Sequence, residues 1–419
     1  MKYSDLKLGD ISNVFRGISI PRDRTSVDFE IPYLHYGDIY KIYNNYLDVS
    51  KEIKSIIKIK SNEKIKEYQY LQSDDIVINL TSENYEDLGK SIYIDNKDNK
   101  LVAGMETTII RFNKSIKHSP LFLKYYFDTS FFYNDILQYV RGMKVFRVNP
   151  KDLLRAKLPN IVLNQQIKIA EYIKNLDDKI EINNKINKNL ETLAQILYKH
   201  WFVDFEFPNE NGEPYKSSGG EMVDSELGLI PKGWEILNLE DRFAFERGIE
   251  PGSKNYQQVK DSDSIPFYRV GDLNQKSELF VNKALVKAKI VYEDDILVSF
   301  DGAIGRIGIG FSGAYSTGLR KVYDKDKKIS NSFVYNMMKS SHIQETMAAH
   351  ANGTTILHAG SSIPFLKIAF DKSIVESYEY SVNPIFEKII EIIKEIQKLA
   401  EIRDTLLPKL MNGEIEVPV

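Results

Sequence analysis

The first part of the chain is patterned as short strands with a helix against them. Apolar residues cluster or alternate over a few positions at 75–79 and 107–112, which is the pattern of β-strands. The aromatic-rich segment 121–127 predicts a helix that packs on those strands. Residues 1–160 are therefore expected to form one mixed α and β domain.

A long helix is predicted to follow this domain. Between about residues 165 and 201, apolar side chains recur at steps of three and four, at Ile169, Ile173, Leu176 and Ile180 and again at Ile186, Leu190, Leu193 and Leu197. A helix of this length spans roughly 55 Å at about 1.5 Å per residue, far more than a usual globular helix. Its seven-residue-like spacing indicates packing against a second long helix. We therefore interpret residues 161–203 as a central spacer helix.

The same order of elements then repeats. Residues 204–233 form an acidic linker that contains Gly, Ser and Pro, and residues 234–380 are patterned as a second mixed domain. Residues 381–419 are expected to be a second spacer helix and tail, with an apolar stripe readable over 386–407. Two long helices of one chain would most simply pair antiparallel, with one mixed domain at each end.

Short motifs recur in the two mixed domains, which indicates that both are copies of one module. The correspondences are LKLGD at 6–10 with LNLED at 237–241, Arg16-Gly17 with Arg247-Gly248, Gly89-Lys90 with Gly305-Arg306, and Gly142 with Gly353. The offset falls from 231 residues at Asp10 to 211 at Gly142, so the first copy carries the longer insertions. Two similar sites at a fixed spacing suit a long ligand that is gripped at two places.

Charge and composition narrow the class of protein. The net charge of −3 does not point to nucleic acid, but residues 204–226 hold seven acids and one base, so a basic face elsewhere would have to be local. The chain has no cysteine, which excludes disulfides and thiolate metal sites. It also lacks an apolar run of about 18 residues and an apolar signal-peptide core at its start. A cytoplasmic bacterial or archaeal protein is expected.

No catalytic or metal-binding signature is found in the sequence. Residues 84–91 imitate the end of a phosphate-binding loop, but Asn84 stands where the first glycine is required. The glycine-rich segment 300–310 predicts a tight loop between strands, because no helix pattern follows it. The six histidines show no metal-ligand spacing, and no Pro-Pro dipeptide of an amino-methyltransferase motif occurs. A non-catalytic chain without a metal or a cofactor of its own is therefore expected.

Basic side chains beside glycine turns are the candidates for ligand binding. Such a side chain can reach a phosphate or the edge of guanine, although a solvated surface charge is the plainer explanation for any one of them. The candidate DNA-binding residues are Arg16, Lys90, Arg141, Lys144, Arg147, Arg247, Arg306, Arg320 and Lys321, with the polar loop residues Ser299, Asp301, Thr354, Thr355 and His358.

Three segments carry a specific family resemblance. The sequence NLETLAQILYKHWFVDF at 189–205 resembles the central region of the specificity subunits of type I restriction-modification systems. The segment MVDSELGLIPKGW at 222–234 is similar to the family's entry into its second recognition domain, and RDTLLPKLMNGEI at 403–415 to its closing motif. With the duplicated module, the resemblance covers essentially the whole chain.

The resemblance implies an α+β fold and a division of labour. It implies two similar mixed α/β target-recognition domains, separated by two long antiparallel coiled-coil-like helices, each domain reading half of a split site in double-stranded DNA. The helices would dock two modification (methyltransferase) subunits, and motor-nuclease subunits could join. S-adenosylmethionine is then expected in the partner methyltransferase and not here. The candidate partner-binding residues are Leu190, Leu197, Trp201, Phe202 and Leu407.

Two other classes of function remain open at this point. A structural adaptor, with a coiled-coil rod and two protein- or carbohydrate-binding domains, would agree with the near-neutral charge. A fused enzyme with its own methyltransferase or nuclease would need motifs that the sequence lacks. Salt-dependent DNA binding would argue against the first, and an inactive isolated chain with S-adenosylmethionine and DNA would argue against the second.

Overall fold

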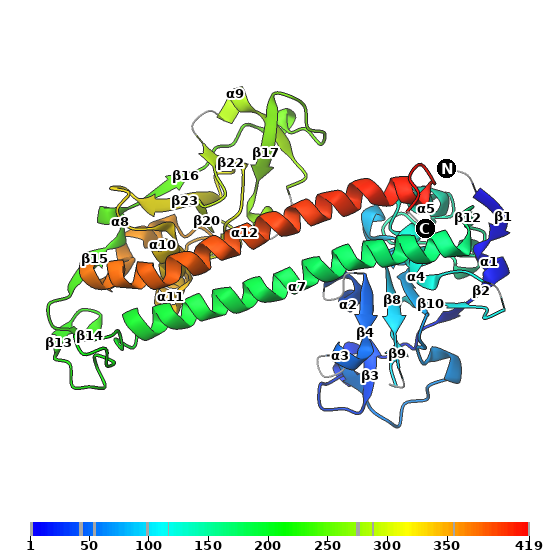
Figure 1. The fold of residues 1–419 in the computed structure, drawn as a ribbon, viewed down its shortest axis with the longest axis horizontal. Helices are drawn as coiled ribbons and strands as arrows, with labels where there is room; N and C mark the ends of the chain where they lie inside the picture. The colour runs from blue at the N-terminus through cyan, green and yellow to red at the C-terminus, as the bar shows by residue number, and fades with distance from the viewer. Residues whose placement is uncertain are drawn as a thin grey trace. The chain divides into compact units, whose positions relative to one another are not determined.

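The computed structural model describes residues 3–41, 45–52, 56–97, 100–115, 117–273, 277–286, 289–354 and 357–417. The chain divides into two compact units, one formed by residues 1–180 with 398–419 and the other by residues 181–397 (Figure 1). Each unit holds one of the predicted modules together with part of each long helix. Across the described ranges, no helix is long and apolar enough to cross a membrane.

Unit 1 is built around a five-stranded sheet with the order β2-β10-β6-β8-β4, which is antiparallel except for the β4–β8 pair. Smaller sheets pair β3 with β5 and β9, β7 with β11, and β1 with β12. The strands and helices are β1 (Tyr3–Lys7), α1 (Leu8–Ile11), β2 (Ser12–Arg16), β3 (Ile31–Leu34), α2 (Tyr36–Lys41), β4 (Tyr46–Asp48), α3 (Val49–Glu52), β5 (Lys58–Ile59), β6 (Ile76–Asn79), β7 (Thr81–Ser82), β8 (Ser91–Asp95), β9 (Val102–Ala103), β10 (Thr107–Phe112), α4 (Pro120–Phe127), α5 (Ser130–Leu137), β11 (Phe146–Arg147), α6 (Pro150–Leu153) and β12 (Lys157–Pro159).

The aromatic segment of unit 1 forms the helix that its sequence predicts. Pro120 occupies the first turn of α4, and the Ser119 hydroxyl caps it by accepting from the backbone N–H of Phe122. Phe122 and Tyr126 are fully buried in the same cluster as Ile78 of the central strand β6. Burying one such side chain contributes about 2 kcal/mol, so this helix anchors the sheet.

Unit 2 repeats the plan with a sheet of order β16-β23-β20-β21 and a second sheet of order β18-β17-β22-β19. Its strands and shorter helices are β13 (Met222–Ser225), β14 (Gly228–Pro231), β15 (Glu235–Asn238), α8 (Leu239–Arg242), β16 (Phe243–Arg247), β17 (Ser264–Tyr268), β18 (Phe280–Asn282), α9 (Lys283–Val286), β19 (Ile290–Val291), β20 (Ile296–Ser299), β21 (Ile307–Gly308), β22 (Gly313–Tyr315), β23 (Leu319–Asp324), α10 (Asn331–Lys339), α11 (Ser341–Ala349) and β24 (Lys367–Phe370). Within the glycine-rich segment 300–310, residues 300–306 form the predicted loop between strands, and β21 follows at once and pairs with β20.

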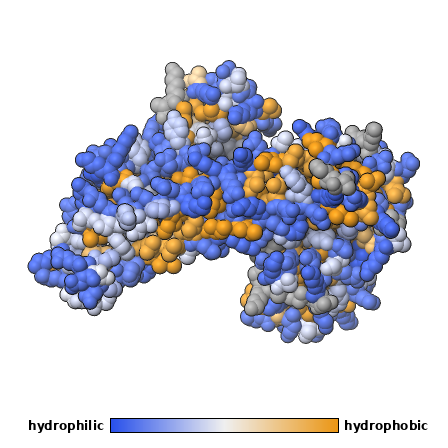
Figure 2. Space-filling model, in the orientation of Figure 1, coloured by the Kyte–Doolittle hydropathy of each residue, from blue (hydrophilic) through white to orange (hydrophobic). Residues whose placement is uncertain are grey.

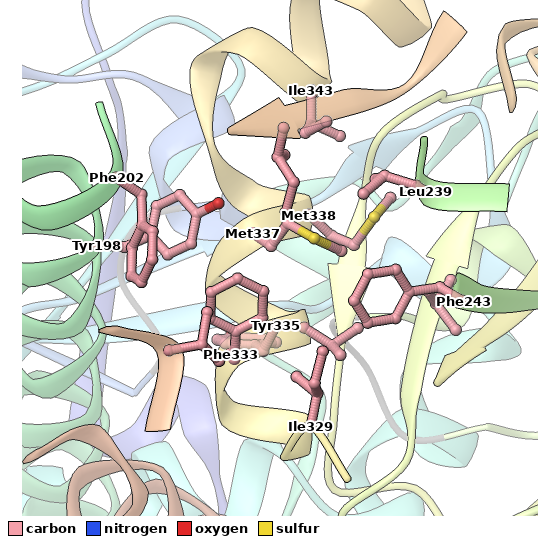
Figure 3. Close-up of a cluster of buried hydrophobic side chains, with 14 of the residues drawn as sticks. Tyr198, Phe202, Leu239, Phe243, Ile329, Phe333, Tyr335, Met337, Met338 and Ile343 are labelled. Carbon is pink, nitrogen blue, oxygen red and sulfur yellow. The ribbon is translucent and has the colours of Figure 1, made fainter. Parts of the chain in front are cut away.

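The core of unit 2 joins the module to one of the long helices. Met337 and Met338 of α10 are fully buried and lie near Phe243 of β16 (Figure 3). Phe333 of the same helix meets Phe202 edge to face, with ring centroids 5.2 Å apart. Because Phe202 belongs to the long helix, the module and this part of the helix share one hydrophobic core.

The long helices are α7 (Leu163–Phe202) and α12 (Lys372–Met411), each of 40 residues. The first agrees closely with the predicted spacer helix. The second begins well before the range 386–407 in which its stripe was readable, and also before the predicted domain boundary at residue 380. That boundary was wrong. Asp371 caps the true start by accepting from the backbone N–H groups of Ser373 and Ile374 at 2.9 and 3.0 Å.

The two long helices run antiparallel within each unit. In unit 2, Asn183 donates to Glu395 at 2.9 Å, and the Tyr378 hydroxyl donates to the carbonyl of Ala194 at 3.3 Å. Residue numbers therefore rise along one helix as they fall along the other. In unit 1, Asp177 of α7 pairs with Arg403 of α12.

The acidic segment between α7 and the second module is an ordered structure and not a loose linker. Phe207 stacks on Trp234 with ring centroids 5.2 Å apart, and Phe205 meets the same indole edge to face at 5.5 Å. Tyr215 stacks on the other side of Phe207 at 4.7 Å, and β13 pairs with β14 as a hairpin. The charged residues dominate the composition of this segment, but its aromatic residues fix its conformation.

Candidate nucleic-acid interface

Two arginines of unit 2 face each other across a pair of strands. Arg247 ends β16 and lies directly opposite Arg320 of β23, so both side chains are on one face of the sheet. Like charges at directly opposed positions destabilise a sheet. Such a pair therefore suggests a surface that is shaped for an electron-rich ligand.

A carboxylate and an imidazole lie beside these arginines. Asp301 follows β20, and its Oδ1 is 2.7 Å from Nδ1 of His358. Its Oδ2 is 4.0 Å from Nη2 of Arg247, whose Nε donates to the carbonyl of Thr317 at 3.2 Å. The Asp301 side chain is 24% exposed, whereas those of Arg247 and His358 are about 60% exposed (61% and 59%). The carboxylate thus lies deeper than the two side chains that flank it.

The Arg320 guanidinium is held in place before any ligand arrives. It lies over the ring of Phe300 at 4.9 Å from the centroid, a cation–π contact. Burial lowers the pKa of Arg320, and the nearby Arg247 lowers it further, while Asp301 acts in the opposite direction. Gly360 leaves the space that the guanidinium occupies, because a Cβ there would lie 2.8 Å from Nη2.

The remaining wall of the site is a short backbone ribbon. Asn352 and His358 exchange two backbone hydrogen bonds, of 2.9 and 2.7 Å, around the turn that begins at Gly353. The Asn352 amide donates to the hydroxyl of Ser361 at 2.9 Å. These groups border a cavity of about 350 Å³ that is open to the surface and is lined by Arg247, Asp301, Arg320, Asn352, His358, Gly360 and Ser361.

Unit 1 builds the same backbone frame with other side chains. Arg141 and Arg147 exchange two backbone hydrogen bonds of 2.9 and 2.8 Å, as Asn352 and His358 do 211 residues later. The turn residue has a φ of 109° at Gly142 and of 121° at Gly353, a region that favours glycine. The two loops are therefore structural equivalents.

Strand register extends this equivalence to the facing arginines. Arg16 of β2 lies opposite Thr108 of β10, just as Arg247 lies opposite Arg320. Arg147 pairs with Thr81 in β7, where His358 forms a bridge to Asp301. The first module thus presents Arg16, Thr81, Thr108, Arg141 and Arg147 at the positions of Arg247, Asp301, Arg320, Asn352 and His358.

Most of the predicted basic residues are exposed on these loops. Arg141 is 79% exposed and lies 3.6 Å from Asp152, and the side chains of Arg16, Lys144 and Arg147 are also exposed. Met143 at the tip of the turn is 95% exposed. In unit 2, Thr354 is exposed at the corresponding turn, and Thr355 lies outside the described residues.

Lys90 and Arg306 occupy equivalent turns that lie outside the cavity. The backbone N–H of Asn79 donates to the carbonyl of Lys90 at 2.9 Å, and that of Ser299 to the carbonyl of Arg306 at 2.8 Å. The Lys90 side chain pairs with Asp87 at 2.7 Å. Both basic side chains are exposed, so they remain candidates for phosphate contacts.

Two of the predicted DNA-binding residues are structural instead. Ser299 is fully buried, and its hydroxyl donates to the carbonyl of Ala303 and accepts from the backbone N–H of Arg306. Lys321 follows Arg320 along β23 and therefore points to the opposite face, where it pairs with Asp295 at 3.1 Å. Neither side chain faces the cavity. Asn352 and Ser361 line the cavity but were not among the predicted residues, although the offset of 211 residues at Gly142 would have indicated Asn352 as the counterpart of Arg141.

The predicted partner-binding residues also need correction. Phe202 and Leu407 are 6% and 9% exposed and belong to the internal cores, and Leu190, Leu197 and Trp201 are partly buried against the core of unit 2. The exposed apolar stripe of α7 in this unit is a different one, formed by Ile182, Ile186, Leu193 and Ile196, and Val203 continues it directly after the helix ends. In Figure 2, hydrophobic residues gather along this helix. An adjacent hollow of about 430 Å³ is lined by α7 and by the junction of α10 and α11 at 339–341.

Comparison with known proteins places these features in a family. The family profile of the type I restriction modification DNA specificity domain matches residues 2–192 and 231–365. The HindI specificity subunit of Haemophilus influenzae is 25% identical over 475 aligned positions, which cover 99% of each chain. The MjaIX specificity subunit of Methanocaldococcus jannaschii is 28% identical over 319 positions, covering 71% of this chain and 69% of that one.

A solved structure shares the fold. The type I restriction-modification S subunit of M. genitalium aligns with 98% of this chain and 96% of its own, with a TM-score of 0.53 and 16% sequence identity. The two profile matches fall on the two modules that the internal repeat and the strand registers define. The chain therefore belongs to the family of type I restriction-modification DNA specificity domains and carries two copies of that domain.

Proposed function

We propose that the chain is the DNA-specificity subunit of a type I restriction-modification complex, in which each module reads one half of a bipartite DNA site. The observation that carries this proposal is the shared backbone frame with different side chains. Arg141 of the first module and Asn352 of the second occupy equivalent positions in their backbone ribbons, as do Arg147 and His358. A frame that is kept while its contact residues differ suits two readers of two different sequences.

The chain's part in the reaction is recognition and not catalysis. Base contacts from the loop side chains specify the site, and phosphate contacts from exposed basic residues such as Lys90, Lys144 and Arg306 position the duplex. Affinity would then fall steeply as salt rises. The target base would be flipped into the pocket of a methyltransferase subunit, which would supply S-adenosylmethionine, so no cofactor is assigned to this chain.

The long helices are proposed to dock two methyltransferase subunits. The exposed stripe at Ile182, Ile186, Leu193, Ile196 and Val203 supports this proposal, because apolar side chains on a helix face are the kind of surface that a partner helix covers. Motor-nuclease subunits would join the same complex to cleave DNA. A cytoplasmic location is proposed for such a complex.

Adenine-methylation mapping tests the proposal. The cognate methyltransferase is expressed in a host with and without this chain, and methylated adenines are mapped across the genome. The expected result is a split motif that vanishes when the chain is absent. An unchanged methylation pattern, with assembly of the complex verified, would reject the reader function and favour a structural adaptor.

A further inference from the structure

The cavity of unit 2 offers donors and an acceptor together. Its arginines, Arg247 and Arg320, supply guanidinium N–H groups, and Asp301 supplies carboxylate oxygens. His358 already occupies Oδ1 of Asp301 at 2.7 Å, whereas Oδ2 faces Arg247 at the longer distance of 4.0 Å. A ligand for this cavity must therefore present both acceptor and donor atoms.

A phosphate group does not meet that requirement. All of its exposed oxygens are acceptors, so the Asp301 carboxylate would repel it. A base pair seen from the major groove can meet it, since guanine shows the adjacent acceptors O6 and N7 and its paired cytosine shows an amino donor at N4. Arginine bonds guanine in a bidentate manner because its donors form a planar fork, and Asp accepts from the cytosine amino group.

The geometry also shows which arginine is prepared for base recognition. Arg320 lies over Phe300, is held in the space beside Gly360, and is half-buried. Arg247 is 61% exposed and lies at the rim. A guanidinium that is already oriented loses less conformational entropy on binding, which favours Arg320 as the reader and Arg247 as a supporting donor.

The first module carries other side chains at the positions of Arg320 and Asp301. Thr108 stands at the position of Arg320, and Thr81 at the position of Asp301. Neither threonine can offer a guanidinium fork or a carboxylate. The pair formed by Arg320 and Asp301 therefore has no counterpart at the equivalent positions of the first module.

We propose that Arg320 and Asp301 read one G·C base pair in the half-site of the second module, with Arg320 donating to guanine and Asp301 accepting from cytosine. His358 positions the carboxylate. This inference rests on the proposed function, because it assigns residues to one of the two half-sites that the chain is proposed to read.

Methylation mapping of the assembled complex tests the assignment with Arg320→Lys and Asp301→Asn. Lysine keeps the charge but loses the fork, and asparagine keeps the shape but adds a donor. Both variants are expected to relax the same single G·C position of the motif, with the preference for guanine there falling on the order of tenfold to a hundredfold. All other positions of both half-sites should stay unchanged. Arg269→Lys, at an arginine of the same module that is 52% exposed and does not line the cavity, serves as the matched control and should relax no position.

Three results would overturn the assignment. One is that neither variant relaxes a G·C pair in the half-site of the second module. Another is relaxation of different positions by the two variants. The last is a uniform loss of methylation by an assembled Arg320→Lys complex, which would indicate a phosphate contact. Failure of the proposed function looks different, because the wild-type complex would then yield no split motif at all.

Discussion

Arg403 of α12 donates to Asp177 of α7 across 2.8 Å, and this ion pair ties the two long helices together inside unit 1. Asp177 is only 9% exposed and also accepts from the Tyr125 hydroxyl at 2.9 Å and from the Asn45 amide at 2.6 Å. The helices and the first module are thus linked by one carboxylate with three donors from three segments. Burial alone would lower the pKa of Arg403, but the hydrogen bond and charge of Asp177 outweigh it and raise that pKa.

Loss of this ion pair should destabilise unit 1. Arg403→Met keeps most of the apolar stem but leaves a buried carboxylate with one charged donor fewer, so we expect a loss of about 3 kcal/mol in the free energy of unfolding. Urea denaturation of the purified chain measures it. Asp404→Asn alters the exposed neighbour of the same arginine, at 57% exposure, and should change stability by less than about 1 kcal/mol. Equal effects of the two variants would contradict the structural account.

Acid should weaken unit 2 through Asp324. Burial alone would raise its pKa, but the backbone N–H groups of Ile329 and Lys328 and the Arg242 guanidinium together lower the pKa below its ordinary value of 3.8. The unfolded chain therefore takes up a proton before the folded chain does. The contribution of Asp324 to the stability of unit 2 is fully present above about pH 3.8 and is lost as the pH falls below that value.

The Asp324→Asn variant checks this pH dependence. Its stability should be lower than that of the wild type at neutral pH and should fall less steeply between pH 5 and about pH 3. Thermal unfolding over that range is the measurement. Parallel curves for the two proteins would show that other carboxylates govern the acid response.

The exposed stripe on α7 should control assembly. Ile196→Asp and Leu193→Asp place a charge on side chains that are 59% and 46% exposed, so the fold should tolerate them while binding of a methyltransferase subunit weakens by at least about tenfold. Co-purification and calorimetric titration with that subunit test this. Val259→Asp, at an apolar residue that is 80% exposed outside α7, is the matched control and should bind normally.

The turn at Gly142 should matter to one half-site only. An alanine there would adopt an unfavourable φ of 109°, and its Cβ would lie 2.1 Å from the carbonyl oxygen of Val145. Gly142→Ala is therefore expected to distort the ribbon that carries Arg141 and Arg147. In methylation mapping, specificity should be lost in the first module's half of the motif and retained in the other half.

A control separates this effect from general damage. Gly271→Ala adds a methyl group where no atom lies within 4 Å and where φ is not positive, so it should leave both halves of the motif intact. A Gly142→Ala variant that degrades both halves to the same extent would contradict the existence of two independent readers.

The sequence predicted where the modules and their elements lie better than it predicted which way individual side chains face. The internal repeat and the alternation of apolar positions are local signals, and they located β6, β10, α4 and α7. The early part of α12 was missed because Pro384 interrupts a stripe that continues through Val375, Tyr378, Val382, Phe386 and Ile389, all of them buried. Tertiary packing keeps this segment helical in spite of the proline.

The candidate site was predicted only in part, for a similar reason. Four of the predicted residues meet in one cavity: Arg247 and Arg320, proposed because they lie near glycine turns, and Asp301 and His358, proposed as polar loop residues. Proximity to a glycine turn could not separate Arg320 from Lys321, because a strand sends adjacent side chains to opposite faces. In the same way, helical spacing identified apolar positions on α7 but could not tell which of them face the chain's own core.

The packing of Phe205 and Phe207 on Trp234 has a mechanical consequence. The composition of this segment is that of a flexible linker, but its packing forms a rigid connection between the end of α7 and the second module. The second module is therefore fixed to that end of the helix and does not rotate about it. Any adjustment of its reading loops to a longer or shorter gap in the DNA would therefore have to come from bending of the helices or of the duplex.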